Sequence, residues 1–104
     1  MGPKKQRTVA VNADITSAMN YAIQAIKQCG WKVSKVDGFV IKVQTGISLA
    51  SWGETILIQI RTINNQKVLN VSSEFVWGLI DIMEINQKNV NKYLTTLSRI
   101  VQIA

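Results

Sequence analysis

The stretch of residues 55–75, TILIQIRTINNQKVLNVSSEF, alternates apolar and polar residues on both sides of a central Asn64-Asn65 pair. One parity of its two halves is apolar at most positions: Ile56, Ile58, Ile60, Leu69, Val71 and Phe75. Such alternation is typical of strands that bury one face. Asparagine tolerates the left-handed backbone conformation that a tight turn requires. The stretch therefore predicts a β-hairpin whose inward face belongs to the core.

A second hairpin is predicted immediately upstream. Its strands cover residues 31–36 and 40–49, and the dipeptide Asp37-Gly38 lies between them. This dipeptide favours a type I′ turn, in which both central residues need a positive φ. The two hairpins together form an antiparallel meander.

Trp52 lies where the two hairpins join. The arms at residues 40–49 and 54–63 are equal in length, which favours one long hairpin with residues 50–53 as its turn and Trp52 at the tip. In the alternative layout the first arm ends at Thr45 and an irregular apolar loop follows. The length match favours the hairpin.

Two amphipathic helices flank the strands. Residues 14–29 carry apolar side chains at helical spacing, with N-cap candidates at residues 12–14 and Gly30 in position to end the helix. Residues 86–103 carry a second apolar stripe, and a short strand at residues 8–11 precedes the first helix. The members of the second stripe are Val90, Tyr93, Leu94, Leu97, Ile100 and Val101.

The predicted order of elements is β-α-β-β-β-β-α. Each helix has one apolar stripe and each strand one apolar parity, so two layers bury both. The fold class is therefore α+β, an antiparallel sheet of about five strands with two helices packed on one face. Residues 1–7 are predicted to be a disordered basic tail, and residues 8–104 a single domain.

This order of elements resembles the TATA-binding-protein-like, or helix-grip, arrangement. The segments TGISLASWGE at residues 45–54, VSSE at 71–74 and NQKNVNKYL at 86–94 also look like small uncharacterised domains of bacteria. The resemblance implies a helix lying across a curved sheet, where a gap would hold an apolar ligand. It implies no biochemical activity, because this fold hosts unrelated functions.

The charge of the chain is mildly basic. Twelve basic and six acidic residues give a formal net charge of +6, and the predicted tail supplies three of the basic residues through Lys4, Lys5 and Arg7. The remainder holds nine basic against six acidic residues, and a surplus of this size mainly favours solubility.

Several functions are not expected from the residue types present. The chain has no histidine and a single cysteine, Cys29, so neither a metal site, a cofactor nor an internal disulfide is expected. A Gly-rich phosphate loop and a nucleophile motif are also absent from the sequence. Glu54 and Glu74 would come close together at the open end of the hairpin closed by Asn64-Asn65, as a carboxylate pair for acid–base catalysis. Two solvated carboxylates are the simpler interpretation. The sequence therefore predicts a protein that is not an enzyme.

Six residues are candidates for a binding site: Trp52, Trp77, Asp81, Lys32, Lys35 and Lys42. Trp52 either contacts a ligand or partner from an exposed tip or folds back over the hairpin, and we favour the second interpretation. Trp77 and Asp81 lie in a stretch without clear periodicity. Asp81 is either a buried functional carboxylate or a residue that caps a turn, and we favour the cap. The three lysines, together with Lys27, would form a patch for phosphate or an acidic partner unless they are merely solvated.

The sequence predicts a small, non-catalytic binding or interaction module. The partner is either a protein or an apolar small molecule, and we expect a monomer or a weak homodimer. The alternative is weak nucleic-acid binding through the basic tail and the sheet face, which has few cations and no aromatic platform. No apolar run approaches the roughly 20 residues of a membrane span, and the lone cysteine suits a reducing compartment, so we expect a cytoplasmic protein.

Overall fold

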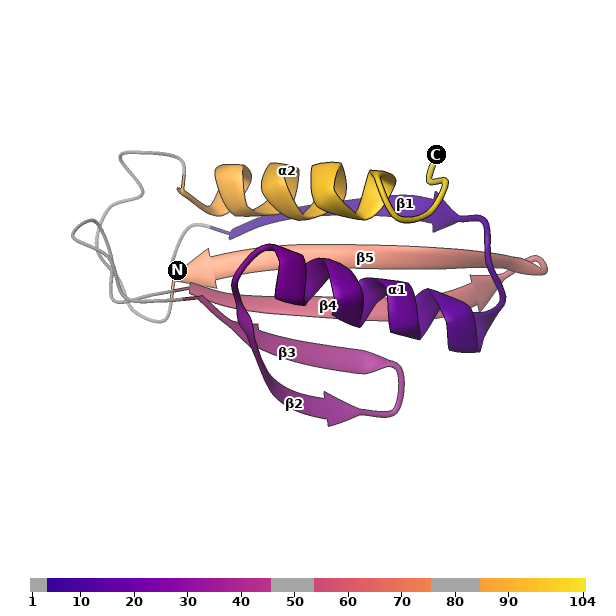
Figure 1. Ribbon diagram of the computed structural model, residues 1–104, viewed down its shortest axis with the longest axis horizontal. Helices are drawn as coiled ribbons and strands as arrows, with labels where there is room; N and C mark the ends of the chain where they lie inside the picture. The colour runs from indigo at the N-terminus through magenta and orange to yellow at the C-terminus, as the bar shows by residue number, and fades with distance from the viewer. Residues whose placement is uncertain (1–3, 46–53, 76–84) are drawn as a thin grey trace.

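The computed structural model describes residues 4–45, 54–75 and 85–104 and has the predicted order of elements. Its elements are β1 (Lys4–Val11), α1 (Ile15–Gln28), β2 (Lys32–Asp37), β3 (Val40–Gln44), β4 (Glu54–Ile63), β5 (Gln66–Phe75) and α2 (Ile85–Ser98). The strands form one antiparallel sheet in the order β1-β5-β4-β3-β2. Both helices lie over the same face of this sheet (Figure 1). The predicted α+β fold class is confirmed.

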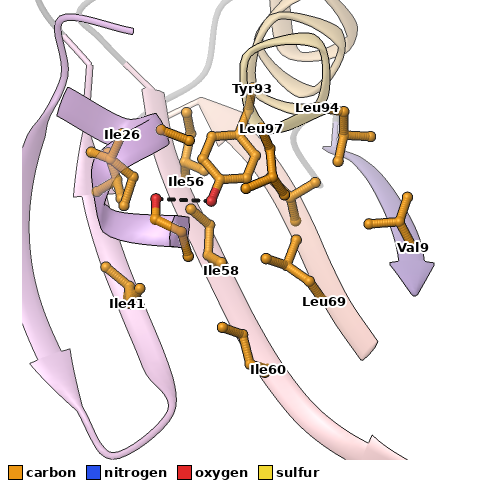
Figure 2. Close-up of a cluster of buried hydrophobic side chains, with 14 of the residues drawn as sticks. Val9, Ile26, Ile41, Ile56, Ile58, Ile60, Leu69, Tyr93, Leu94 and Leu97 are labelled. Carbon is orange, nitrogen blue, oxygen red and sulfur yellow. Dashed lines mark hydrogen bonds between the residues drawn. The ribbon is translucent and has the colours of Figure 1, made fainter. Parts of the chain in front are cut away.

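The core lies between the helices and the sheet. Ile56, Ile58 and Ile60 of β4 are at most 2% exposed, which confirms the inward parity predicted for this strand. The buried side chains of α1 are three alanines and Ile26, whereas α2 contributes Tyr93 and Leu97 (Figure 2). Leu69 of β5 lies in the same hydrophobic cluster. The two helices thus bury the central part of one parity of the sheet.

The ends of α1 follow the sequence signals. The Asp14 side chain is the N-cap and accepts a hydrogen bond of 2.8 Å from the backbone N–H of Ser17. Cys29 is the C-cap, and Gly30 follows it with a φ of 80°. Glycine adopts this left-handed conformation without the steric cost that a Cβ atom brings.

The end of α2 corrects a prediction. The helix ends at Ser98, whereas the apolar stripe predicted a helix as far as Ile103. The chain instead runs beside β1, where Ala10 and Ala104 exchange two N–H···O hydrogen bonds of 3.0 Å, and Ile103 pairs with Val11 in an antiparallel bridge. These bonds to a strand distant in sequence replace the helical ones.

The start of β1 corrects a second prediction. We expected residues 1–7 to form a disordered tail before a strand at residues 8–11. The strand begins at Lys4, and the register pairs Lys5 with Ser73 and Arg7 with Val71 of β5. Residues 4–7 therefore belong to the sheet. The neighbouring strand β5 supplies hydrogen-bond partners for the backbone, and polar residues form these backbone bonds as readily as apolar residues do.

The two tight turns differ in backbone conformation. Asn64 and Asn65 both have a positive φ, 51° and 65°, which confirms the turn predicted there. In the β2–β3 hairpin, Asp37 is the last residue of β2, and the two-residue loop is Gly38-Phe39. Only Gly38 has a positive φ, 61°, so the predicted type I′ turn at Asp37-Gly38 is wrong. A glycine at the first central position is typical of a type II′ turn.

Candidate functional site

Three of the six predicted site residues lie on one face of the sheet. Lys32 and Lys35 are in β2 and Lys42 is in β3, and all three side chains are exposed. The register places Lys35 directly opposite Lys42 and Lys32 opposite Gln44. The structure thus brings Lys35 and Lys42 together on adjacent strands, whereas Lys27 lies on α1, in the helical layer.

The other three predicted site residues, Trp52, Trp77 and Asp81, lie outside the residues that the structure describes. The two layouts considered for the join between β3 and β4 also differ only there. β3 ends at Gln44, and its last residue pairs with Thr55 of β4.

The face with the three lysines is the one that the helices leave uncovered, and we call it the outer face. Its described members are Gln6, Thr8 and Ala10 of β1, Gln66, Val68, Asn70 and Ser72 of β5, Thr55, Leu57, Gln59, Arg61 and Ile63 of β4, Val40, Lys42 and Gln44 of β3, and Lys32, Lys35 and Asp37 of β2. Leu57 and Ile63 are 38% and 46% exposed. Amides and hydroxyls surround them, so this face offers hydrogen-bonding groups around exposed apolar side chains.

A polar groove lies at one end of the molecule. Its volume is about 430 Å³, and it is lined by residues 10–14, Gln66, Lys67 and residues 102–104. Asp14 is already engaged there, because its carboxylate accepts hydrogen bonds from Ser17. Those bonds, chiefly the one from the Ser17 backbone N–H, hold the pKa of Asp14 below its usual value. The carboxylate of the groove is therefore a helix cap.

A cluster of buried polar groups joins α2 to β5. Ser73 Oγ donates to Asn86 Oδ1 at 2.8 Å and accepts from Asn89 Nδ2 at 3.2 Å. Ser73 and Asn86 are fully buried. A hydroxyl that is enclosed and hydrogen-bonded in this way fixes the packing of the helix on the sheet rather than meeting a substrate.

A cation–aromatic contact that the sequence gave no reason to expect joins the two helices. Lys92 Nζ donates to the Cys29 carbonyl at 3.1 Å and lies 5.5 Å from the centroid of the Trp31 ring. Trp31 in turn stacks on Tyr93, with 6.4 Å between the ring centroids. Lys92 thereby places a positive charge at the C-terminus of α1, where the helix dipole favours it. The four residues explain helix packing, and Cys29 is buried there, as predicted.

Glu54 and Glu74, the two residues considered as a carboxylate pair, lie at strand positions of opposite parity. The register places Glu54 at a position on the helix side of the sheet and Glu74 at a position on the outer face. Within the described ranges there is also no group of three cysteine, aspartate or glutamate residues arranged to hold a metal ion. No helix of the described residues is long and apolar enough to span a membrane.

The sequence matches no protein-family model and no curated protein. The β-α-β-β-β-β-α order on which the helix-grip resemblance depends is present. The geometry of the outer face therefore carries the functional argument.

Proposed function

We propose that the protein is a small, non-catalytic interaction module that binds a partner protein on the outer face of its sheet. The observation that carries the proposal is the contrast in covering: both helices lie over one face of the sheet, while no helix of the described residues lies over the other (Figure 1). On this face the exposed Leu57 has Lys42 and Ser72 as its cross-strand neighbours and Gln59 as the next outer-face residue of its own strand. Mixed apolar and amide-bearing surfaces of this kind suit a protein partner. A cytoplasmic location is part of this proposal.

An apolar small molecule is a less suitable partner. In a helix-grip arrangement its place would be between a helix and the sheet, where Tyr93, Ile26 and Ile58 are completely buried. The Tyr93 hydroxyl of α2 donates to the Ala22 carbonyl of α1 at 3.0 Å and so joins the two helices above the sheet (Figure 2). The side chains thus contact one another across the layer, and the groove of 430 Å³ lies elsewhere and is polar.

Weak nucleic-acid binding is the second candidate function. The observation in its favour is that Lys32, Lys35 and Lys42 share one corner of the outer face with no intervening helix. Among the described residues of that face there is no aromatic side chain on which a base would stack. Binding would therefore depend on phosphate contacts and fall steeply with salt. Filter binding at low and moderate salt measures this directly.

The proposed protein partner is tested by differential capture. Immobilised wild-type protein and two variants are exposed to an extract of the native host, and bound proteins are quantified by mass spectrometry. Leu57→Glu places a charge in the centre of the outer face, and Thr95→Glu places the same charge on the exposed side of α2. We expect a partner whose capture falls at least about tenfold with Leu57→Glu and is unchanged with Thr95→Glu. Equal capture by all three proteins contradicts the proposal.

The association state is part of the same proposal. A surface rich in amides and hydroxyls favours a monomer or a weak homodimer, because strong self-association needs a larger apolar contact. Sedimentation velocity at micromolar concentration measures it. A stable tetramer would contradict this expectation.

A further inference from the structure

One edge of the sheet is only half occupied. The edge strand β1 pairs with β5 on one side, and the segment at residues 102–104 pairs with the other side of its C-terminal half. The Ala10 N–H donates to the Ala104 carbonyl and the Asn12 N–H to the Gln102 carbonyl, both at 3.0 Å. This edge therefore already accepts an extended, antiparallel segment.

Within the part of the chain that the structure describes, the other half of the same edge pairs with no further strand. In an antiparallel strand both backbone polar groups of a residue point to one side, and the side alternates along the chain. The backbone N–H and C=O of Ala10 point away from β5, because both bond to Ala104. The backbone groups of Gln6 and Thr8, four and two residues earlier, therefore point to the same side. No backbone hydrogen bond from these two residues reaches an acceptor among the described residues, and both side chains are exposed. Gln6 and Thr8 therefore offer N–H and C=O groups to an added strand.

The side chains between these groups are basic. Lys5 and Arg7 share the helix-side parity with Val9, and both are exposed. The strand KKQRTVAV contains no acidic residue. A second copy of β1 pairing at this edge would place like charges opposite one another, which is destabilising. Basic residues on an edge are a common protection against such pairing, but the same charges attract an acidic strand.

We propose that the half-open edge of β1, between Lys4 and Thr8, binds an extended acidic peptide segment by antiparallel strand addition. Backbone bonds to Gln6 and Thr8 provide the pairing, and acidic side chains at alternate positions of the peptide lie opposite Lys5 and Arg7. The opposite edge, β2, is interrupted by a register shift between Val33 and Lys35 and lacks this regular pattern. The inference goes beyond the outer face and does not depend on it.

The first test measures binding and backbone pairing together. A short capped peptide that alternates glutamate with threonine is titrated into the labelled protein, and amide hydrogen exchange is followed by NMR. We expect exchange at Gln6 and Thr8 to slow by at least about tenfold on saturation. Exchange at Arg7 and Val9, which already pair with β5, should change little. Failure of the peptide to bind, or binding without protection at Gln6 and Thr8, overturns the proposal.

The second test separates the edge from general electrostatic attraction. Lys5→Glu/Arg7→Glu and Lys32→Glu/Lys35→Glu change the net charge equally, but only the first alters β1. We expect the first variant to lose at least about tenfold in affinity for the acidic peptide, and the second less than about threefold. Equal losses would show that the overall charge, and not the edge, attracts the peptide.

A backbone variant completes the test. Gln6→Pro removes one outward N–H, and proline is tolerated on an edge strand where that group faces solvent. It should weaken peptide binding while leaving the unfolding temperature nearly unchanged, and undiminished binding would contradict strand addition. Leu57→Glu on the outer face should leave peptide binding intact. The proposal for the β1 edge and the proposal for the outer face are therefore tested independently of each other.

Discussion

The two faces of the sheet are built from the same strands but differ in what they do. On β4, Ile58 is completely buried against the helices, while its neighbour Leu57 is 38% exposed on the outer face. On β5, Ser73 is fixed in a hydrogen-bonded cluster, while Ser72 lies on the outer face. One parity of the strands therefore forms the core with the helices, and the other is the face on which we propose binding.

The largest difference between the faces should appear when Ile58 and Leu57 are truncated. Ile58→Ala removes a buried side chain and leaves a cavity, so it should cost about 2–5 kcal/mol of unfolding free energy. Leu57→Ala removes an exposed side chain and should cost less than about 1 kcal/mol. Urea unfolding measures both. Similar costs for the two variants would show that something covers the outer face.

The two adjacent serines provide a second, smaller contrast. Ser73→Ala removes the hydroxyl that bonds to Asn86 and Asn89 and leaves buried amides without it, so it should cost about 1–3 kcal/mol. The Ser72 hydroxyl makes no hydrogen bond within the described part of the chain. Ser72 is also buried, at 7% exposed, but Ser72→Ala breaks no such bond, so it should cost less than Ser73→Ala, by about 1 kcal/mol or more. Chemical denaturation distinguishes the two, and a reversed order would contradict the cluster.

Tyr93 gives the buried face a pH dependence. Burial raises the pKa of Tyr93 well above its usual value, with a smaller contribution from Cys29, so the folded state keeps this phenol protonated. Above about pH 10 the unfolded chain releases the proton while the folded chain retains it, so stability falls with a slope of up to about 1.4 kcal/mol per pH unit. Below that pH the stabilisation is fully present.

Tyr93→Phe tests this dependence. Loss of the hydrogen bond to the Ala22 carbonyl should cost about 0.5–1.5 kcal/mol at neutral pH. The fall in unfolding free energy above about pH 10 should also become shallower, by up to about 1.4 kcal/mol per pH unit, because one fewer group titrates. The control is Tyr21→Phe on α1, which removes the same hydroxyl group from a side chain that is only partly buried. Denaturant melts between neutral pH and pH 11 or so measure the difference.

The sequence was sufficient to predict the buried face, and local patterns explain why. Alternation in β4, the helical stripe that contains Val90 and Tyr93, and the Asn64-Asn65 turn are all encoded within a few neighbouring residues. Each pattern reflects a local preference that the tertiary structure satisfies.

The features that the sequence did not predict depend on partners distant along the chain. Ile100 and Val101 continue the apolar stripe, yet the chain leaves the helix after Ser98 to run beside β1. The polar start of β1 shows no alternation, because an exposed edge strand buries little. The Lys92–Trp31 contact joins residues from different elements and has no periodic signature. For the candidate site, the sequence named Lys35 and Lys42, but not their direct opposition across two strands.

The smallest effect is expected at the centre of the outer face. Gln59 is exposed on β4, where it lies between Val40 of β3 and Asn70 of β5 and belongs to the outer face. Gln59→Thr exchanges a flexible amide for a residue that strands favour, so stability should change by less than about 0.5 kcal/mol. Thermal unfolding of this variant measures that change in stability. If Gln59→Thr weakens partner capture while leaving stability unchanged, binding and folding are separated on alternate residues of one strand. A loss of more than about 1 kcal/mol would instead assign Gln59 a structural role and weaken the distinction between the faces.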